Sequence, residues 1–261
     1  MKRIEVDDEV YGRFQKFQNG ADESKVLDKL VTYGRQRRRR DDEQIALVIL
    51  EGVWYDFSTN PGHASNAPFL EGVCRFVDTM NSYRLNFYDA TSFAKALEWA
   101  VTVPEKRIIL YIGEHGSTKK IGNSHALTLM KKVAEMSRDY SKIEGVILSS
   151  CLVGSHDDAL EAGLKGGAHW VFGYTSSVDF IGSAQVESSI LATIARSGSD
   201  YVDDEHQIAA LFAEGLKRFN PDWMIGDGAK PELRNSVRLV VRGKHKKTAC
   251  EATKVMTQLA W

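Results

Sequence analysis

The chain has 261 residues, of which 43% are hydrophobic, and this is enough apolar material for one sizeable α/β core and a small additional module. Its 34 Lys and Arg residues against 35 Asp and Glu residues give a formal net charge of −1, which excludes an overall positive field for nucleic acid or an anionic membrane. Apolar runs such as residues 45–50 are far shorter than the ~20 residues that a membrane-spanning helix needs, so we expect no span.

The N-terminus and the cysteines bear on the compartment. Acidic residues interrupt positions 1–9 before any apolar stretch forms, which argues against a signal peptide and predicts a cytoplasmic protein. The three cysteines, Cys74, Cys151 and Cys250, show no CxxC spacing and are odd in number. This pattern disfavours a disulfide framework and a zinc site, and it predicts free thiols.

Residues 1–34 predict a strand and two short helices. Positions 2–7 alternate in the manner of a half-buried strand, and apolar residues at helical spacing follow on both sides of Asn19-Gly20. So short a segment buries too little surface to fold as a monomer, and its strand needs a pairing partner. Pairing with the same strand of a second copy predicts a ribbon-helix-helix-like homodimer.

The amino-acid sequence of residues 1–34 supports that interpretation. It resembles the N-terminal oligomerisation segment of the replication-sequestration protein SeqA, in the residues from Ile4 to Tyr11 and in Glu23-Ser24, which opens the second helix. The alternative is DNA binding, because ribbon-helix-helix repressors lay paired strands in the major groove. The outward positions here carry Arg3, Glu5 and Asp7, and the two carboxylates disfavour contact with phosphates and favour dimerisation.

Residues 35–43 read Arg-Gln-Arg-Arg-Arg-Arg-Asp-Asp-Glu and form a charge run without apolar periodicity. Such a run predicts a solvated linker. Weak nonspecific affinity for nucleic acid and proteolytic cleavage within the run are the alternatives. The domain boundary is therefore expected here.

Residues 44–261 alternate apolar strand candidates with amphipathic helices, which predicts a mainly parallel six-stranded sheet flanked by helices. The expected strands are 45–50, 83–88, 107–112, 144–149, 169–173 and 236–242. The expected helices are 67–80, 91–101, 124–138, 156–166, 183–196, 204–219 and 248–260.

A His and a Cys follow the third and fourth of these strands. In open parallel sheets, ligands bind outside the carboxyl ends of the strands, so His115 and Cys151 are expected at one edge. An imidazole beside a thiol raises its reactivity and can later protonate a leaving amine. We expect Cys151 as nucleophile, His115 as base, and the N–H groups of Gly116 and Cys151 as an oxyanion hole.

A strand ending in His-Gly, then one helix, then a strand ending in Ser-Cys resembles the caspase-like, or clan CD, cysteine peptidases over residues 44–242. Glu51-Gly52-Val53-Trp54 is similar to a bacterial subgroup of that family. The resemblance implies endopeptidase activity on proteins or peptides, through a Cys-His dyad and without a cofactor or metal. Eukaryotic caspases have Gln-Ala-Cys where this chain has Ser149-Ser150-Cys151, so cleavage after Asp is not carried over.

The other histidines and cysteines were considered for catalytic or metal-binding roles. His156, five residues after Cys151, is a rival base, although the acids that follow it suggest a helix start. Cys74 and Cys250 lie beside apolar neighbours and are expected in the core. The remaining histidines show no ligand spacing, so we expect no metal.

Substrate preference is open from the sequence. The resemblance to clan CD implies acidic side chains near the strand ends in a pocket that accepts Arg or Lys, and Asp56 and Asp179 are the candidates here, with surface solvation as the alternative. The segment 220–235 is long for a connection and is either a substrate-covering loop or a surface excursion. The sequence thus predicts a dimeric cysteine endopeptidase. The alternative is a catalytically inactive scaffold or DNA-associated regulator that dimerises through its N-terminus.

Overall fold

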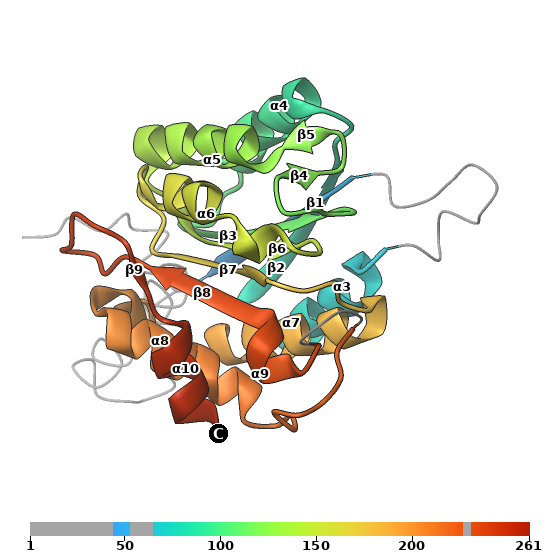
Figure 1. Ribbon diagram of the computed structural model, residues 1–261. Coiled ribbons are helices and arrows are strands. Elements are labelled where there is room, and N and C mark those ends of the chain that lie inside the picture. The colour runs from blue at the N-terminus through green and yellow to red at the C-terminus, as the bar shows by residue number, and fades with distance from the viewer. Residues whose placement is uncertain (1–43, 53–64, 227–230) are drawn as a thin grey trace, which may run out of the picture. The chain divides into compact units, whose positions relative to one another are not determined.

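The computed structural model describes residues 44–52, 65–226 and 231–261 (Figure 1). The chain divides into two compact units, Met1–Asp42 and Glu43–Trp261. The ribbon-helix-helix module and the linker expected in residues 1–43 lie outside the described residues. They therefore stay predictions.

The second unit is built on a seven-stranded sheet with the order β2-β1-β3-β6-β7-β8-β9. Its strands are β1 (Ile45–Glu51), β2 (Met80–Asn86), β3 (Arg107–Gly113), β6 (Ile143–Ser149), β7 (Trp170–Tyr174), β8 (Val237–Val241) and β9 (Cys250–Glu251). The strands β2, β1, β3, β6 and β7 are parallel, and β8 and β9 are antiparallel to their neighbours. The predicted mixed α/β architecture with a mainly parallel sheet is confirmed. The short seventh strand β9 was not predicted.

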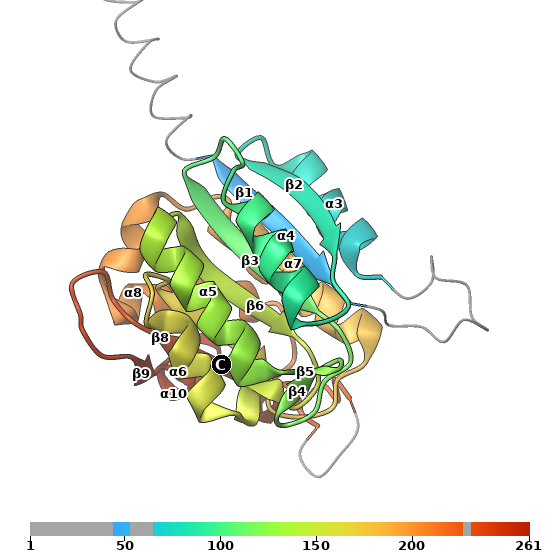
Figure 2. The same ribbon diagram turned by 90° about the horizontal axis from the view of Figure 1, so that it is seen from above.

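Helices cover both faces of this sheet (Figures 1 and 2). One face carries α4 (Ala90–Ala100), α5 (Ala126–Tyr140) and α6 (Asp157–Leu164). The other face carries α3 (Ala67–Phe76), α7 (Phe180–Ile194), α8 (Glu205–Leu216) and α10 (Thr253–Ala260). Short elements complete the unit: the β4 (Lys120–Ile121) and β5 (Ser124–His125) hairpin, α9 (Leu233–Ser236), and the 3₁₀ turns η2 (Val153–Ser155) and η3 (Ser199–Asp203). Among the described helices, none is both long and apolar enough to span a bilayer.

The strand β1 shows how the sequence builds two cores from one sheet. All of its residues are buried, and its side chains alternate between the faces. Ile45, Leu47 and Ile49 pack in the α3/α7/α8 core, and Ala46 and Val48 pack in the α4/α5/α6 core. A continuous apolar run is what a strand buried on both faces requires, which is why β1 was predicted within one residue.

The boundaries of β2 differ from the prediction because tertiary pairing sets them. The sequence suggested residues 83–88, but β2 runs from Met80 to Asn86, with Ile45 paired to Met80 and Glu51 paired to Asn86. It is an edge strand with half-exposed polar positions, so its own residues specify the register weakly.

A buried ion pair fastens the amino ends of β3 and β6. Arg107 Nε lies 2.6 Å from Glu144 Oε2, and Arg107 Nη2 donates to Glu144 Oε1 at 2.9 Å. The Tyr201 hydroxyl also donates to Glu144, and it accepts a hydrogen bond from Trp170 Nε1 at 2.9 Å. This network ties η3 to the sheet end that lies away from the strands' carboxyl ends.

We predict that Arg107→Ala lowers the free energy of unfolding by about 3–5 kcal/mol, because it leaves the Glu144 carboxylate buried without its cation. Urea denaturation measures the change. The matched control is Lys132→Ala, which breaks the exposed Lys132–Glu135 pair and is expected to cost less than about 1 kcal/mol. Equal losses in the two variants would contradict the prediction.

Candidate active site

The carboxyl ends of β3 and β6 lie side by side, with Gly113 paired to Ser149 in parallel register. His115 follows β3 by two residues, and Cys151 follows β6 by two residues. Both segments therefore leave the sheet at the same edge.

The glycine after His115 packs directly on the Cys151 backbone. A Cβ atom at Gly116 would lie 2.8 Å from Cys151 N and 2.9 Å from Ser150 Cβ, and it would also overlap Cys151 O. Real Cβ atoms do not approach neighbours so closely, so only glycine fits there. The structure thus brings together the His-Gly segment and the Cys151 turn.

Two backbone N–H groups are left available at this contact. Gly122 N donates to His115 O at 2.7 Å and Ser117 N donates to Lys120 O at 2.9 Å, which makes Gly116 and Ile121 the non-hydrogen-bonded pair of that bridge. Within the described chain, neither the Gly116 N–H nor the Cys151 N–H donates to a backbone acceptor. Gly116 and Cys151 are only partly buried, and an available pair of N–H groups beside a thiol has the arrangement needed to hold an external oxygen.

The Cys151 thiol is half-buried and has two polar neighbours. Its Sγ lies 3.7 Å from the Val178 carbonyl oxygen and 3.9 Å from Ser177 Oγ. The carbonyl accepts from the protonated thiol, whereas the Ser177 hydroxyl is able to donate to the thiolate. Both neighbours come from the segment between β7 and α7.

The buried Glu114 side chain stands immediately before His115 and was missed from the sequence. A Cβ atom at Gly52 would overlap the Glu114 carboxylate, and one at Gly122 would lie 2.6 Å from Glu114 Cδ. Gly122 also has a φ of +54°, which glycine adopts at low cost. Two glycines therefore make room for this acid, and the Glu-Gly pair that ends β1 was the available signal.

The turn after Cys151 is strained and held at several points. Leu152 has a φ of +64°, an uncommon conformation for a residue with a branched side chain. Leu152 N donates to Ser176 O at 3.0 Å, and Ser155 Oγ donates to Thr175 O at 3.2 Å. A strained turn persists when its surroundings over-determine it, and here the segment after β7 supplies part of that restraint.

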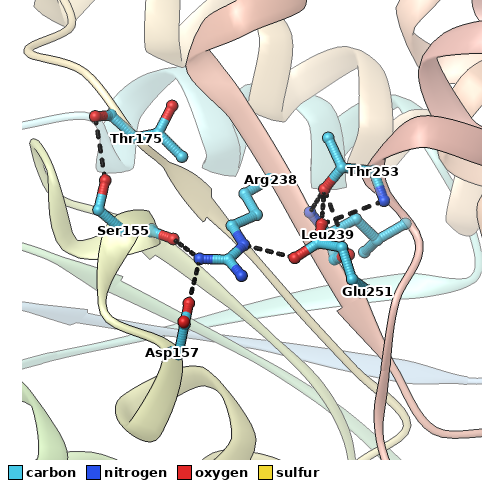
Figure 3. A network of polar contacts seen from close by, with 8 residues as sticks. Ser155, Asp157, Thr175, Arg238, Leu239, Glu251 and Thr253 are labelled. Atoms are coloured by element: carbon cyan, nitrogen blue, oxygen red, sulfur yellow. Dashed lines mark hydrogen bonds and ion pairs between the residues drawn. The ribbon is translucent and has the colours of Figure 1, made fainter.

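Arg238 on β8 supplies the rest (Figure 3). Its Nη1 donates to Gly154 O at 3.0 Å and to Asp157 Oδ1 at 2.6 Å, and its Nε donates to Glu251 Oε2 at 2.6 Å. One guanidinium thus joins the Cys151 turn, the start of α6 and the β9 strand. Sequence reasoning missed Arg238 because its partners are distant along the chain.

A second buried acid lies behind the same edge of the sheet. Glu187 on α7 is fully buried, and its carboxyl oxygens have no partner at hydrogen-bonding geometry among the described residues. Burial raises the pKa of Glu187 to about 8, and the nearby hydroxyls of Ser149, Tyr174 and Tyr111 offset only part of that effect. Glu187 is therefore mainly protonated at neutral pH.

The other residues singled out from the sequence have varied surroundings. Asp179 caps α7, because its Oδ1 accepts from Gly182 N at 2.7 Å, and Asp56 lies outside the described residues. His156 precedes α6 without a side-chain cap hydrogen bond. Their proposed roles stay predictions.

The expectation that both other cysteines are core residues is half right. Cys74 packs partly buried against the α3/α7/α8 core, where burial raises its pKa to about 11. Cys250 is exposed, so its prediction as a core residue is wrong. It lies on the two-residue edge strand β9, where both side chains face solvent.

The fold has solved counterparts. No protein-family model and no curated protein sequence matches the chain. A secreted C11 cysteine protease from Bacteroides thetaiotaomicron, called iotapain, superimposes with a TM-score of 0.50 at 14% identity, covering 76% of this chain and 66% of that one. Another structure of a secreted C11 cysteine protease from the same organism, in complex with an irreversible peptide inhibitor, gives a TM-score of 0.47 at 12% identity, with 75% and 65% covered. The architecture is thus the caspase-like fold of C11 proteases.

One expectation is contradicted by the comparison with iotapain. The sequence suggested a cytoplasmic protein, but iotapain, the C11 protease with a TM-score of 0.50, is a secreted protein. The prediction had relied on the acids within residues 1–9, and such a local feature does not define a compartment.

We predict that Arg238→Gln loosens the Cys151 turn. Charge-assisted hydrogen bonds contribute about 1.5–3 kcal/mol, so the Leu152 amide is expected to exchange with solvent about tenfold faster or more. Hydrogen–deuterium exchange of the 150–157 peptide measures this. Arg234→Gln, which removes an exposed ion pair with Asp222, is the matched control and is expected to leave that peptide unchanged. Unchanged exchange in Arg238→Gln would refute the role of Arg238.

We also predict a pH dependence of stability from Glu187. The pKa of its carboxyl rises from 4.5 to about 8 on folding, so between these values the folded state holds more protons than the unfolded one. The free energy of unfolding therefore falls as pH rises through that window, by up to about 1.4 kcal/mol per pH unit. Glu187→Gln is expected to flatten this slope in urea titrations at several pH values. Exposed Glu135→Gln is the control, and a wild-type slope retained in Glu187→Gln contradicts the assignment.

Proposed function

We propose that the protein is a cysteine endopeptidase that cleaves proteins or peptides. The observation that carries the proposal is the packing of Gly116 on the Cys151 turn, with an available N–H on each side of the contact. This arrangement supports Cys151 as the nucleophile and the two N–H groups as donors, at the sheet edge where His115 also emerges. The caspase-like fold is consistent with it.

The proposed reaction begins with proton transfer from the Cys151 thiol to His115. The thiolate attacks the scissile carbonyl, and a C–S bond forms while the carbonyl electrons move onto oxygen. The N–H groups of Gly116 and Cys151 hold that oxyanion. Collapse breaks the C–N bond, and the leaving amine takes the proton from His115. Water then attacks the thioester with His115 as base and releases the second product.

The local contacts suit each of these steps. Ser177 Oγ donates to the sulfur and the Val178 carbonyl accepts from it, so the two contacts orient the resting thiol. The restraints on Leu152 and Gly154 hold the turn that follows Cys151 before substrate arrives. A donor fixed in advance costs no reorganisation during the reaction.

Two acidic residues are proposed to set the substrate preference. Asp56 and Asp179 are the candidates for a pocket that binds Arg or Lys side chains. Asp179 uses one carboxyl oxygen as a helix cap, which leaves the other for a ligand. Homodimerisation through residues 1–34 is likewise proposed, with the acidic outward positions of that module disfavouring DNA.

We predict that Cys151→Ala and His115→Ala each abolish hydrolysis of a peptide library, because residues that act as one catalytic unit fail together. Circular dichroism and thermal unfolding show whether the variants remain folded. Cys250→Ala removes an exposed thiol and is expected to keep full activity.

The same experiment separates the alternatives. Loss in His156→Ala with activity retained in His115→Ala would assign the base to His156. Activity retained in Cys151→Ala would refute the mechanism, and a wild-type protein that cleaves nothing would favour the inactive scaffold.

A further inference from the structure

A basic loop follows β8 at the end of the sheet opposite Cys151. It reads Arg-Gly-Lys-His-Lys-Lys-Thr over residues 242–248. Because β8 is antiparallel to β7 and pairs Val241 with Trp170, this loop lies beside the amino ends of the parallel strands. The loop is remote from the proposed catalytic residues, and the proposed function leaves it unexplained.

The loop and the end of α6 together line a hollow of about 310 Å³. This volume is at the lower end of the range for small-molecule sites. Three cationic side chains line it, namely Lys165, Arg242 and Lys247, with Glu161 as the acidic one. Leu164 and Ala249 add apolar wall. The hollow therefore combines a positive balance of charge with a small apolar surface.

The charge of Arg242 is poorly compensated. Its Nη2 donates to the Ala168 carbonyl oxygen at 3.3 Å, while its Nε is buried without an acceptor in the described chain. Burial lowers the pKa of Arg242, since the charged form loses hydration without gaining a carboxylate. A guanidinium held in this state gains more from an incoming anion than a fully hydrated one does.

The two lysines add to this imbalance. Within the described residues, Lys165, Arg242 and Lys247 all lie beyond ion-pair distance of any carboxylate, whereas Lys244 of the same loop pairs with Asp203 at 3.5 Å. Surface lysines alone are usually just solvated. Here they flank a partly buried arginine at the wall of a hollow, and that combination suits an anionic ligand.

We propose that this hollow binds the diphosphate group of a small phosphorylated molecule. A diphosphate concentrates several negative charges in a few ångströms, which matches three cations around one small volume. A guanidinium donates two parallel hydrogen bonds to phosphate oxygens, and lysine ammonium groups bind them as point charges. The apolar wall accommodates the uncharged part of the molecule.

The test uses the full-length protein and pyrophosphate as the probe, in isothermal titration calorimetry at about 0.15 M salt. Saturable binding at one site is expected for the wild type. Lys165→Gln with Lys247→Gln is expected to weaken the affinity by about tenfold or more, since two of the three cations are lost. Arg242→Gln is expected to weaken it similarly.

A matched double variant controls for net charge. Lys95→Gln with Lys119→Gln removes two exposed cations on other elements and is expected to leave the affinity unchanged. Thermal unfolding of every variant establishes that binding is compared among folded proteins.

Three outcomes would overturn the proposal. The first is absence of saturable binding by the wild type, and the second is equal weakening in both double variants, which would indicate a general electrostatic effect. The third is a short single-stranded oligonucleotide that binds at this loop and is not displaced by pyrophosphate, which would assign the loop to nucleic acid.

Discussion

The contact between Gly116 and the Cys151 backbone is the constraint on which the rest of the site depends. It exists because β3 and β6 are adjacent parallel strands that end in register, Gly113 opposite Ser149. Any side chain at position 116 would push the two segments apart. The sheet therefore sets the relative backbone positions of His115, Gly116 and Cys151, independently of the rotamers of their side chains.

The antiparallel strand β8 extends this constraint to the turn that carries Cys151. Because β8 runs against β7, its first residues lie at the carboxyl edge of the parallel strands. Arg238, near the start of β8, therefore reaches the Gly154 carbonyl. Side chains alternate along a strand, so Arg238 and Val240 share a face of the sheet, and Arg242 follows two positions later at the opposite end of β8. If β8 ran parallel to β7, Arg238 would lie at the other end of the sheet.

Local patterns predicted the elements whose signals are carried by their own residues. Continuous apolar runs identified β1, β3 and β6, because strands buried on both faces need such runs. The start of β2 was displaced because pairing with β1 sets it, and β9 was missed because two exposed residues carry no pattern. Cys250 was misplaced in the core for the same reason.

The candidate site shows the same limit. His115 and Cys151 could be placed at one edge because strand ends are visible in the sequence. Glu114, Glu187 and Arg238 could not be identified from the sequence, because the residues that surround each of them are distant along the chain. Gly52 and Gly122 are intermediate cases, because a glycine shows that space is needed but not which side chain fills it.

Two buried acids at the carboxyl edge show how surroundings decide the state of a carboxyl group. Glu51 accepts from Ser65 Oγ at 2.7 Å and from Asn66 N at 3.0 Å, and it pairs with Arg84 Nη2 at 3.0 Å. Glu187 has no donor at hydrogen-bonding geometry among the described residues, so burial and, to a smaller extent, the nearby Glu51 charge raise its pKa to about 8, and the surrounding hydroxyls offset only part of this rise. A carboxyl group that is protonated at neutral pH carries no charge that apolar surroundings would have to accommodate, which is why Glu187 can lie fully buried on α7.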